Sequence, residues 1–292
     1  MAFIFRLLAH FPLAVLHNLG ALLGWLTYLW SPTYRRHLRE NTAQAGAWAV
    51  AARATAVAEA GKGLLELPFL WLRPQTEVVA QVVRVSGWEH VEAAWQAGCG
   101  ILFLTPHLGC FEITAQHYAS FKPLTVLYRP PKQAWLQPFI EAGRGAHLKL
   151  AAADLGGVRK LMKALKNGEA VGILPDQVPG RGEGLWAPFF GKPAYTMTLA
   201  ARLAENGATV LLIHAERLPY GAGYHLQLAT LGAPLAATLD ARVAQFNAAL
   251  EGMIATNPGQ YLWGYNRYKA PAGTLPAAAA VDAPAPSQDS TS

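Results

Sequence analysis

Short apolar runs alternate with stretches of helical periodicity along most of this chain, and this alternation constrains its fold more than any other feature. We predict strands at 82–85, 101–104, 124–127, 170–174, 209–215 and 224–228, separated by helical stretches such as 87–97, 158–166 and 195–205. Such alternation is typical of folds in which helices cover the faces of a central sheet. We therefore predict an α/β fold with a mostly parallel or mixed sheet flanked by helices.

The first 30 residues form a separate apolar segment. Residues 3–30 are apolar apart from interruptions at Arg6, His10, Pro12, His17 and Asn18. The uninterrupted run 19–30 has only 12 residues, fewer than the roughly 20 that a membrane-spanning helix needs. We expect residues 1–32 to form a membrane-anchoring helix that either spans the bilayer or lies in its surface, with a buried hairpin of core helices as the alternative. No small-residue cleavage site follows it, which argues against a removable signal peptide.

A basic cluster comes directly after this segment, at Arg35, Arg36, His37 and Arg39. Basic residues beside an apolar segment are retained on the cytoplasmic side of a membrane. We therefore expect one large cytoplasmic domain over 33–269, beginning with one or two helices within 43–71. The tail 270–292 is rich in Ala, Pro, Ser and Thr, a composition that predicts disorder.

The overall composition favours lipid contact. Hydrophobic residues make up 52% of the chain and charged residues 14%, against about 25% charged in a typical soluble domain. The net charge of +6 suits anionic headgroups or an acidic protein partner. Its basic residues are scattered and no nucleic-acid-binding motif is present, so we expect no nucleic acid partner. Cys99 and Cys110 are too few for a structural zinc site, and we expect them to be small core residues.

The segment 101–112, with the sequence ILFLTPHLGCFE, carries the strongest indication of chemistry. It predicts a buried strand that ends just before His107, at the sheet edge where ligands bind in open α/β folds. A helix beginning near Gly109 would place Glu112 in its first turn, from which its carboxylate can reach the imidazole. That contact would fix the tautomer and leave the other ring nitrogen free to accept a proton. The alternative is that Glu112 only favours a helix N-terminus.

No G-x-S-x-G nucleophile elbow occurs in the chain. An acyl-enzyme formed on such a serine is therefore not expected. Direct transfer of a group to a hydroxyl, with a histidine as base, is the simpler chemistry.

The pattern H-x-x-x-x-[DE] after a short apolar strand resembles the signature of the glycerolipid and lipid A acyltransferases. Further segments resemble, in order and spacing, the late lipid A acyltransferases, also called lauroyl and myristoyl acyltransferases: 127–130 (LYRP), 168–177 (ending ILPDQ), 188–191 (PFFG) and 260–263 (QYLW). The resemblance covers about residues 1–269. It implies a membrane-anchored enzyme on the cytoplasmic face of the bacterial inner membrane, which takes its acyl chain from acyl carrier protein and needs no metal or organic cofactor.

The resemblance also implies roles for single residues. His107 matches the family's base and Glu112 its acidic partner. Arg129 matches an arginine that contacts substrate phosphate or developing charge, with a structural ion pair as the alternative. The resemblance also implies that Arg144 and Arg217 stand at positions where the family carries arginine.

Two further pairs of residues are implied to lie at the substrate. Asp176 and Gln177 match a substrate-binding or site-shaping pair, with a loop-opening cap as the alternative. We expect Phe190 and Gly191 beside the acyl channel, although core packing and a turn would explain them equally well.

One departure from the family pattern concerns the acceptor. Relatives usually continue Tyr-Leu-Trp with His, Arg and Arg, whereas this chain has Gly264, Tyr265, Asn266 and Arg267. The missing basic residue would weaken contact with a phosphorylated sugar. A lipid A precursor is the expected acceptor, and an ornithine lipid, an aryl polyene lipid or another glycolipid are the alternatives. A thioesterase or lipase, an acyl-coenzyme A donor and a non-catalytic lipid-binding protein are the competing interpretations.

Overall fold

A mixed sheet of seven strands forms the centre of the computed structural model, which describes residues 2–131 and 133–274. Its strands are β1 (Val82–Ser86), β2 (Ile101–Leu104), β3 (Leu124–Tyr128), β4 (Lys149–Ala152), β5 (Ala170–Ile173), β8 (Thr209–Arg217) and β9 (Tyr224–Thr230), in the spatial order β1-β9-β8-β2-β5-β3-β4. β2 pairs in parallel with β5 and β8, and only the pairing of β8 with β9 is antiparallel within this sheet. The predicted α/β fold is confirmed.

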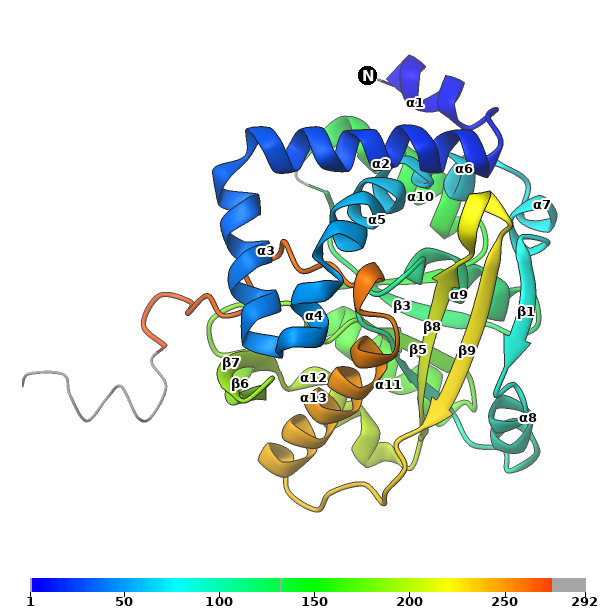
Figure 1. The fold of residues 1–292 in the computed structure, drawn as a ribbon. Helices are drawn as coiled ribbons and strands as arrows, with labels where there is room; N and C mark the ends of the chain where they lie inside the picture. The colour runs from blue at the N-terminus through cyan, green and yellow to red at the C-terminus, as the bar shows by residue number, and fades with distance from the viewer. Residues whose placement is uncertain (1, 132, 275–292) are drawn as a thin grey trace, which may run out of the picture.

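Helices cover both faces of this sheet (Figure 1). They are α1 (Ala2–Leu8), α2 (Leu13–Trp30), α3 (Pro32–Ala45), α4 (Ala47–Ala51), α5 (Arg53–Leu65), α6 (Leu67–Leu72), α7 (Gln75–Val79), α8 (Glu89–Gln96), α9 (Phe111–Ala119), α10 (Gln137–Gly145), α11 (Leu155–Lys166), α12 (Leu199–Leu203) and α13 (Leu239–Thr256). Side chains of α11, α12 and α13 belong to one apolar cluster, and those of α6, α8, α9 and α10 belong to the other. The sheet therefore has a hydrophobic layer on each face.

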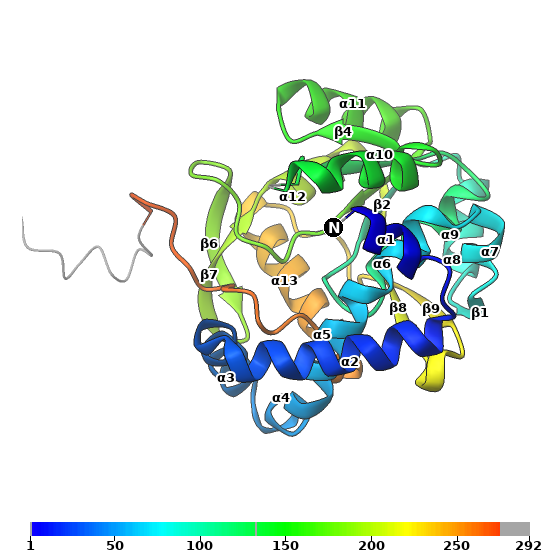
Figure 2. The ribbon, with the colours of Figure 1, turned by 90° about the horizontal axis from the view of Figure 1, so that it is seen from above.

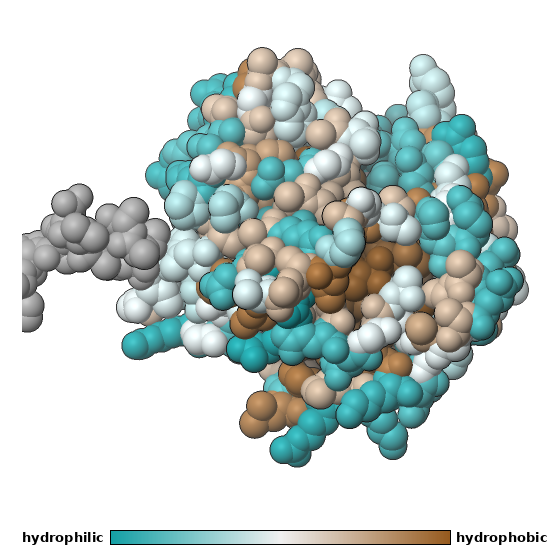
Figure 3. Space-filling view, turned by 90° about the horizontal axis from the view of Figure 1, so that it is seen from below, coloured by the Kyte–Doolittle hydropathy of each residue, from teal (hydrophilic) through white to brown (hydrophobic). Residues whose placement is uncertain are grey.

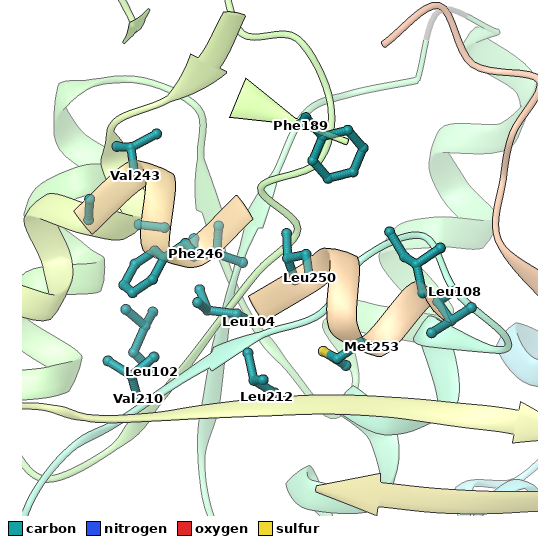
Figure 4. Packing of buried hydrophobic residues seen from close by; sticks show 14 of the residues in the cluster. Leu102, Leu104, Leu108, Phe189, Val210, Leu212, Val243, Phe246, Leu250 and Met253 are labelled. Carbon is teal, nitrogen blue, oxygen red and sulfur yellow. The ribbon is translucent and has the colours of Figure 1, made fainter. Parts of the chain in front are cut away.

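The core beside α13 is built from alternate residues of the central strands. Leu102 and Leu104 of β2 and Leu212 of β8 pack against Phe246 and Leu250 of α13 (Figure 4). The intervening residues of β2 point to the opposite layer, which explains why every residue of this strand is buried. A strand buried on both faces reads as a continuous apolar run, as the sequence indicated.

The six predicted strands are all present, each within two residues of its expected end. The predicted helix at 195–205 is wrong in its first part. Residues there belong to β7 (Lys192–Met197), which pairs with β6 (Gly184–Phe189) in a separate hairpin, and α12 begins only at Leu199. The turn at Phe190 and Gly191 has positive φ values of 48° and 74°, which reverses the chain and lets 192–197 pair as a strand.

Other elements were not predicted. β4, α10 and α13 had no assignment, and residues 43–71 contain parts of four helices rather than one or two. Residues 275–292 of the predicted tail lie outside the described part of the chain.

The N-terminal helix α2 has 18 residues and is, by length and composition, the one helix of the described residues that could cross a membrane. It lies lengthwise across the domain and packs against α5 (Figures 1 and 2). Only 28% of its residues are buried, so it is not a helix of the core.

Candidate active site

The loop after β2 is fixed by backbone hydrogen bonds on both sides. The N–H of Leu262 donates to the carbonyl of His107 at 3.1 Å, and the N–H of Gly109 donates to Gln260 at 3.0 Å. Gly109 has a φ of 59°, and a Cβ there would lie 2.0 Å from the carbonyl oxygen of Ala215. Only glycine fits this position. The segment 260–263 thus holds the loop that carries His107.

His107 forms a close pair with Asp176. Its Nδ1 lies 2.8 Å from Asp176 Oδ1, and its backbone N–H donates to Oδ2 at 2.9 Å. The two residues meet because they follow β2 and β5, which are parallel neighbours and end at the same sheet edge. Burial raises the pKa of the Asp176 carboxyl, but the hydrogen bonds and charge of His107 outweigh burial and hold it below its usual value. Ionised Asp176 fixes Nδ1 as the donor and leaves Nε2 with its lone pair.

The predicted contact between Glu112 and His107 is not present in the structure, because Glu112 is paired with other residues. Glu112 accepts hydrogen bonds from Nε of Arg144 at 2.9 Å, from Nη2 of the same guanidinium, and from the indole N–H of Trp71 at 3.2 Å. It lies in the first turn of α9, as expected, but α6 and α10 supply cationic and N–H donors on its side of the helix. The carboxylate on the imidazole is therefore Asp176, and Glu112 holds Arg144.

Arg144 is a largely buried cation of the site, with 22% of its side chain exposed. Burial lowers the pKa of its guanidinium, but the adjacent Glu112 carboxylate outweighs burial and raises it. Arg144 therefore carries its charge at every physiological pH. Its bidentate pairing with Glu112 leaves part of the guanidinium facing the cavities described below.

The side chain of Gln177 occupies the free side of the imidazole. Its Nε2 lies 3.1 Å from His107 Nε2. With Nδ1 donating to Asp176, Nε2 accepts this hydrogen bond from the amide. Gln177 thus takes the position that a substrate hydroxyl would need.

Two cavities meet at His107, Phe111, Glu112 and Arg144. The first, of about 450 Å³, extends between α2 and α5 and is lined there by Leu23, Leu64 and Leu67. The second, of about 320 Å³, is lined by apolar residues of the sheet edge: Val126, Leu127, Leu148, Leu174 and Met197. Two substrates, one with an apolar chain, can therefore reach His107 from different sides.

A third cavity, of about 480 Å³, continues from the second one toward α11. It shares Leu127, Arg129, Pro179 and Met197 with the second cavity. Arg129 therefore stands where the two join, and its Nη2 also donates to Glu183 at 3.0 Å. Both partners of this ion pair are more than half exposed, so it contributes little stability. The structure places Arg129 in an exposed ion pair at a cavity wall.

Phe190 and Gly191 are not brought to His107. Phe190 packs against Trp48 and Trp263, and its carbonyl accepts from Gln44. Neither residue lines a cavity that His107 lines. These contacts match the packing and turn alternative.

Arg217 and Arg267, the other two arginines named from the resemblance, are deeply buried. Arg217 donates to the carbonyl of Gly109, in the loop that carries His107, at 2.7 Å. Arg267 donates to Tyr195 O and Thr196 Oγ1 and is 2% exposed, so it does not face a headgroup. Gly264, at the position where the resemblance implies a basic residue, lies against Tyr34, and a Cβ there would be 2.1 Å from the Tyr34 ring.

Sequence reasoning missed Trp71 and gave Asp176 only a general role. Trp71 lies in α6 and reaches the site only because α6 packs on α10, a contact with no local signal. Asp176 could have been linked to His107, since both were predicted at the ends of strands.

Comparison with known proteins gives consistent matches. The family model described as bacterial lipid A biosynthesis acyltransferase matches residues 1–270. The chain is 31% identical to the lipid A biosynthesis lauroyltransferase of Escherichia coli K12 over 215 residues, which cover 72% of this chain and 69% of the relative. It is 28% identical to the lipid A biosynthesis palmitoleoyltransferase of the same organism, over 72% and 68% of the two chains.

Proposed function

Because the chain belongs to the family of bacterial lipid A biosynthesis acyltransferases, we propose that it transfers a fatty acyl group from acyl carrier protein to a hydroxyl of a lipid A precursor. The reaction would take place on the cytoplasmic face of the inner membrane. The observation that carries this proposal is the His107–Asp176 pair at the meeting point of two cavities. A base with an oriented lone pair and access for two substrates is what direct acyl transfer requires.

In this mechanism His107 Nε2 accepts the proton of the acceptor hydroxyl, after that hydroxyl has displaced the Gln177 amide. The hydroxyl oxygen then attacks the thioester carbonyl and forms a tetrahedral oxyanion. Collapse of this intermediate breaks the carbon–sulfur bond, and the departing thiolate takes the proton from His107. Asp176 keeps the imidazole in the required tautomer and stabilises its protonated form.

Arg144 is the proposed partner of the oxyanion or of an acceptor phosphate. Glu112 fixes its guanidinium through two hydrogen bonds, and a preorganised cation stabilises charge that develops in the transition state. In this proposal Glu112 serves catalysis through Arg144. Arg129, at the junction of the second and third cavities, is the second candidate for a substrate phosphate.

Helix α11 supports an acidic protein as the donor. It exposes Arg159, Lys160, Lys163 and Lys166 and contains no acidic residue. Its residues Leu155 and Val158 line the third cavity. A thioester-bound chain delivered beside α11 would have an apolar path toward His107. Added salt should raise the KM for an acyl carrier protein by screening these charges, whereas no salt effect would favour acyl-coenzyme A.

The direct test is to incubate the purified protein with acyl carrier proteins of several chain lengths and a panel of lipid acceptors, and to identify the products by mass spectrometry beside His107→Ala. We expect one acyl addition to a lipid A precursor, absent in the variant. The buried Arg267 and the glycine at 264 favour an ornithine lipid or another less charged acceptor as the second candidate. Free fatty acid without an acylated product would instead identify a hydrolase.

A further inference from the structure

Helix α2 is locked to the domain along one face. Leu13, Leu16, His17, Gly20 and Gly24 are its buried residues. The glycines allow backbone contact with α5: a Cβ on Gly20 would lie 2.7 Å from the carbonyl oxygen of Gly61, and one on Gly24 would lie 2.1 Å from that of Val57. His17 Nε2 lies 3.2 Å from Glu66 Oε2. The helix is thus held by close packing and by a buried polar contact.

This attachment has a consequence for any membrane-crossing arrangement. The contacts lie at the middle of α2, so a bilayer-spanning α2 would draw α5 to the same depth. α5 carries Arg53, Glu59 and Lys62, and Glu66 follows it directly. Moving these charges into hydrocarbon is strongly unfavourable. With 18 residues, α2 is also only about 27 Å long, slightly short of the hydrocarbon core.

The opposite face of α2 is apolar and exposed. Its exposed apolar residues, together with those of α1 and the connecting segment, are Phe3, Ile4, Leu7, Phe11, Val15, Leu19, Leu22, Trp25, Leu26, Leu29 and Trp30; we call this set the N-terminal apolar face. α1 and α2 lie along one side of the molecule (Figures 1 and 2). The side turned away from them is mixed, with hydrophilic side chains around much of its edge and a hydrophobic patch near its centre (Figure 3). An apolar area as extensive as the N-terminal apolar face marks an interaction surface.

The charges around this face identify its partner. No Asp or Glu precedes Glu40, whereas Arg6, Arg35, Arg36 and Arg39 all do. Arg35 donates to the last carbonyls of α2, at Tyr28 and Leu29, so this basic group adjoins the helix end. Apolar side chains flanked by arginines, with tryptophans between them, are typical of helices in an anionic membrane interface.

We propose that α1 and α2 lie in the plane of the membrane, with the N-terminal apolar face in the headgroup region of an anionic leaflet and neither helix crossing it. The first cavity then lies directly beneath the membrane-bound helix. Leu23, Gly24 and Thr27 of α2 form one wall, and the exposed Thr27 and Leu64 stand at its mouth. A lipid acceptor reaches His107 from the leaflet through this mouth; that last step rests on the proposed acyl transfer, whereas the membrane geometry does not.

Vesicle binding by the full chain tests the surface. Leu22→Glu places a charge on the N-terminal apolar face, and Val83→Glu on β1 is the matched control because both side chains are 59% exposed. On vesicles of phosphatidylethanolamine and phosphatidylglycerol, we expect Leu22→Glu to weaken binding roughly tenfold and Val83→Glu to leave it unchanged. Equal binding by all three proteins would overturn the proposal. So would a dimer that Leu22→Glu converts to a monomer, because the face would then join two copies of this chain.

Labelling separates the in-plane arrangement from a spanning one. In a Cys99→Ala chain, His10→Cys and Thr33→Cys place a thiol just outside each end of α2, and both positions are exposed. In inside-out membrane vesicles of the producing bacterium, an impermeant maleimide should label both; labelling of only one would show that α2 crosses the bilayer. Acyl transfer in detergent micelles is measured in parallel, since activity there tests the proposed function independently of membrane docking.

Discussion

Two clusters in this protein are built from the same kinds of group, a histidine, carboxylates and an arginine, yet they differ in exposure. The first is the proposed catalytic cluster of His107, Asp176, Glu112 and Arg144, called the catalytic cluster below; the side chains of His107 and Arg144 are 16% and 22% exposed and face cavities. In the anchoring cluster, formed by His17, Glu59, Glu66, Arg217 and Tyr224, the side chains of Arg217 and Glu66 are 4% and 2% exposed.

The anchoring cluster satisfies its groups internally. Glu66 accepts hydrogen bonds from His17, Arg217 and Tyr224, and Arg217 also donates to Glu59 and Gly109. Glu59, Glu66 and Arg217 also line the first cavity, but their charged groups are paired within the cluster. In the catalytic cluster the free nitrogen of the imidazole is hydrogen-bonded to the amide of Gln177, which a substrate hydroxyl could replace. The comparison indicates that the anchoring cluster holds α2, α5 and β8 together, while the catalytic cluster is available for chemistry.

The largest effect should come from His107→Ala. We expect acyl transfer to fall at least about a thousandfold, because both the proton acceptor and its orientation by Asp176 are lost. The free energy of unfolding should fall by no more than about 2 kcal/mol, because Asp176 loses the imidazole but keeps the hydrogen bond from the backbone N–H of residue 107. Turnover by the variant within tenfold of wild type would remove the base assignment.

Glu66→Gln should show the opposite pattern. Removing one partner of a buried ion pair leaves Arg217 undercompensated, and we expect the free energy of unfolding to fall by about 3 to 5 kcal/mol. Denaturant titration measures this loss, and Glu77→Gln, in an exposed ion pair with Arg73, is the control with little effect. A change below 1 kcal/mol at Glu66 would mean that the anchoring cluster does not hold the fold together.

The sequence predicted the local features of the catalytic cluster but not the long-range contacts of either cluster. β2 and His107 were placed correctly because a doubly buried strand and the residue at its end are local features. The partner of His107 was predicted wrongly because Asp176 lies 69 residues away and reaches it only through the pairing of β2 with β5. The anchoring cluster joins residues up to 158 positions apart, and no local pattern indicates such a contact.

Asp176→Asn tests the corrected pairing within the catalytic cluster. An asparagine can present its N–H to the imidazole and stabilise the wrong tautomer, so we expect kcat to fall roughly a hundredfold while the KM values change little. Glu112→Gln, which keeps one oxygen acceptor for Arg144 and leaves Asp176 on His107, should reduce kcat less. Equal losses would mean that Glu112 matters as much as Asp176, and the leading role given to the His107–Asp176 pair would then not hold.

Acid sensitivity should arise in the anchoring cluster. Burial raises the pKa of Glu66, but the charge of Arg217 and the hydrogen bonds from His17 and Arg217 outweigh burial and lower it to about 2, from 4.5. Because the folded-state pKa is depressed, the stabilisation is complete above about pH 4.5 and is lost as pH falls toward 2, by up to about 3 kcal/mol. Denaturant titrations across this window should show the slope in wild type and lack it in Glu66→Gln.

The smallest effect concerns binding of the acyl donor at α11, which we call the docking rim, as distinct from chemistry at His107. Arg159 and Lys163 lie on the exposed face of α11, and reversing both to glutamate should raise the KM for acyl carrier protein about three- to tenfold with kcat unchanged, because rim charges govern encounter. The KM for the lipid acceptor should stay constant. Reversal of Arg84, an exposed residue of β1 at the sheet edge opposite β4, is the control. A loss of kcat in the α11 variant would mean that this helix contributes to the chemistry itself, and the division between a docking rim and a reactive centre would then not hold.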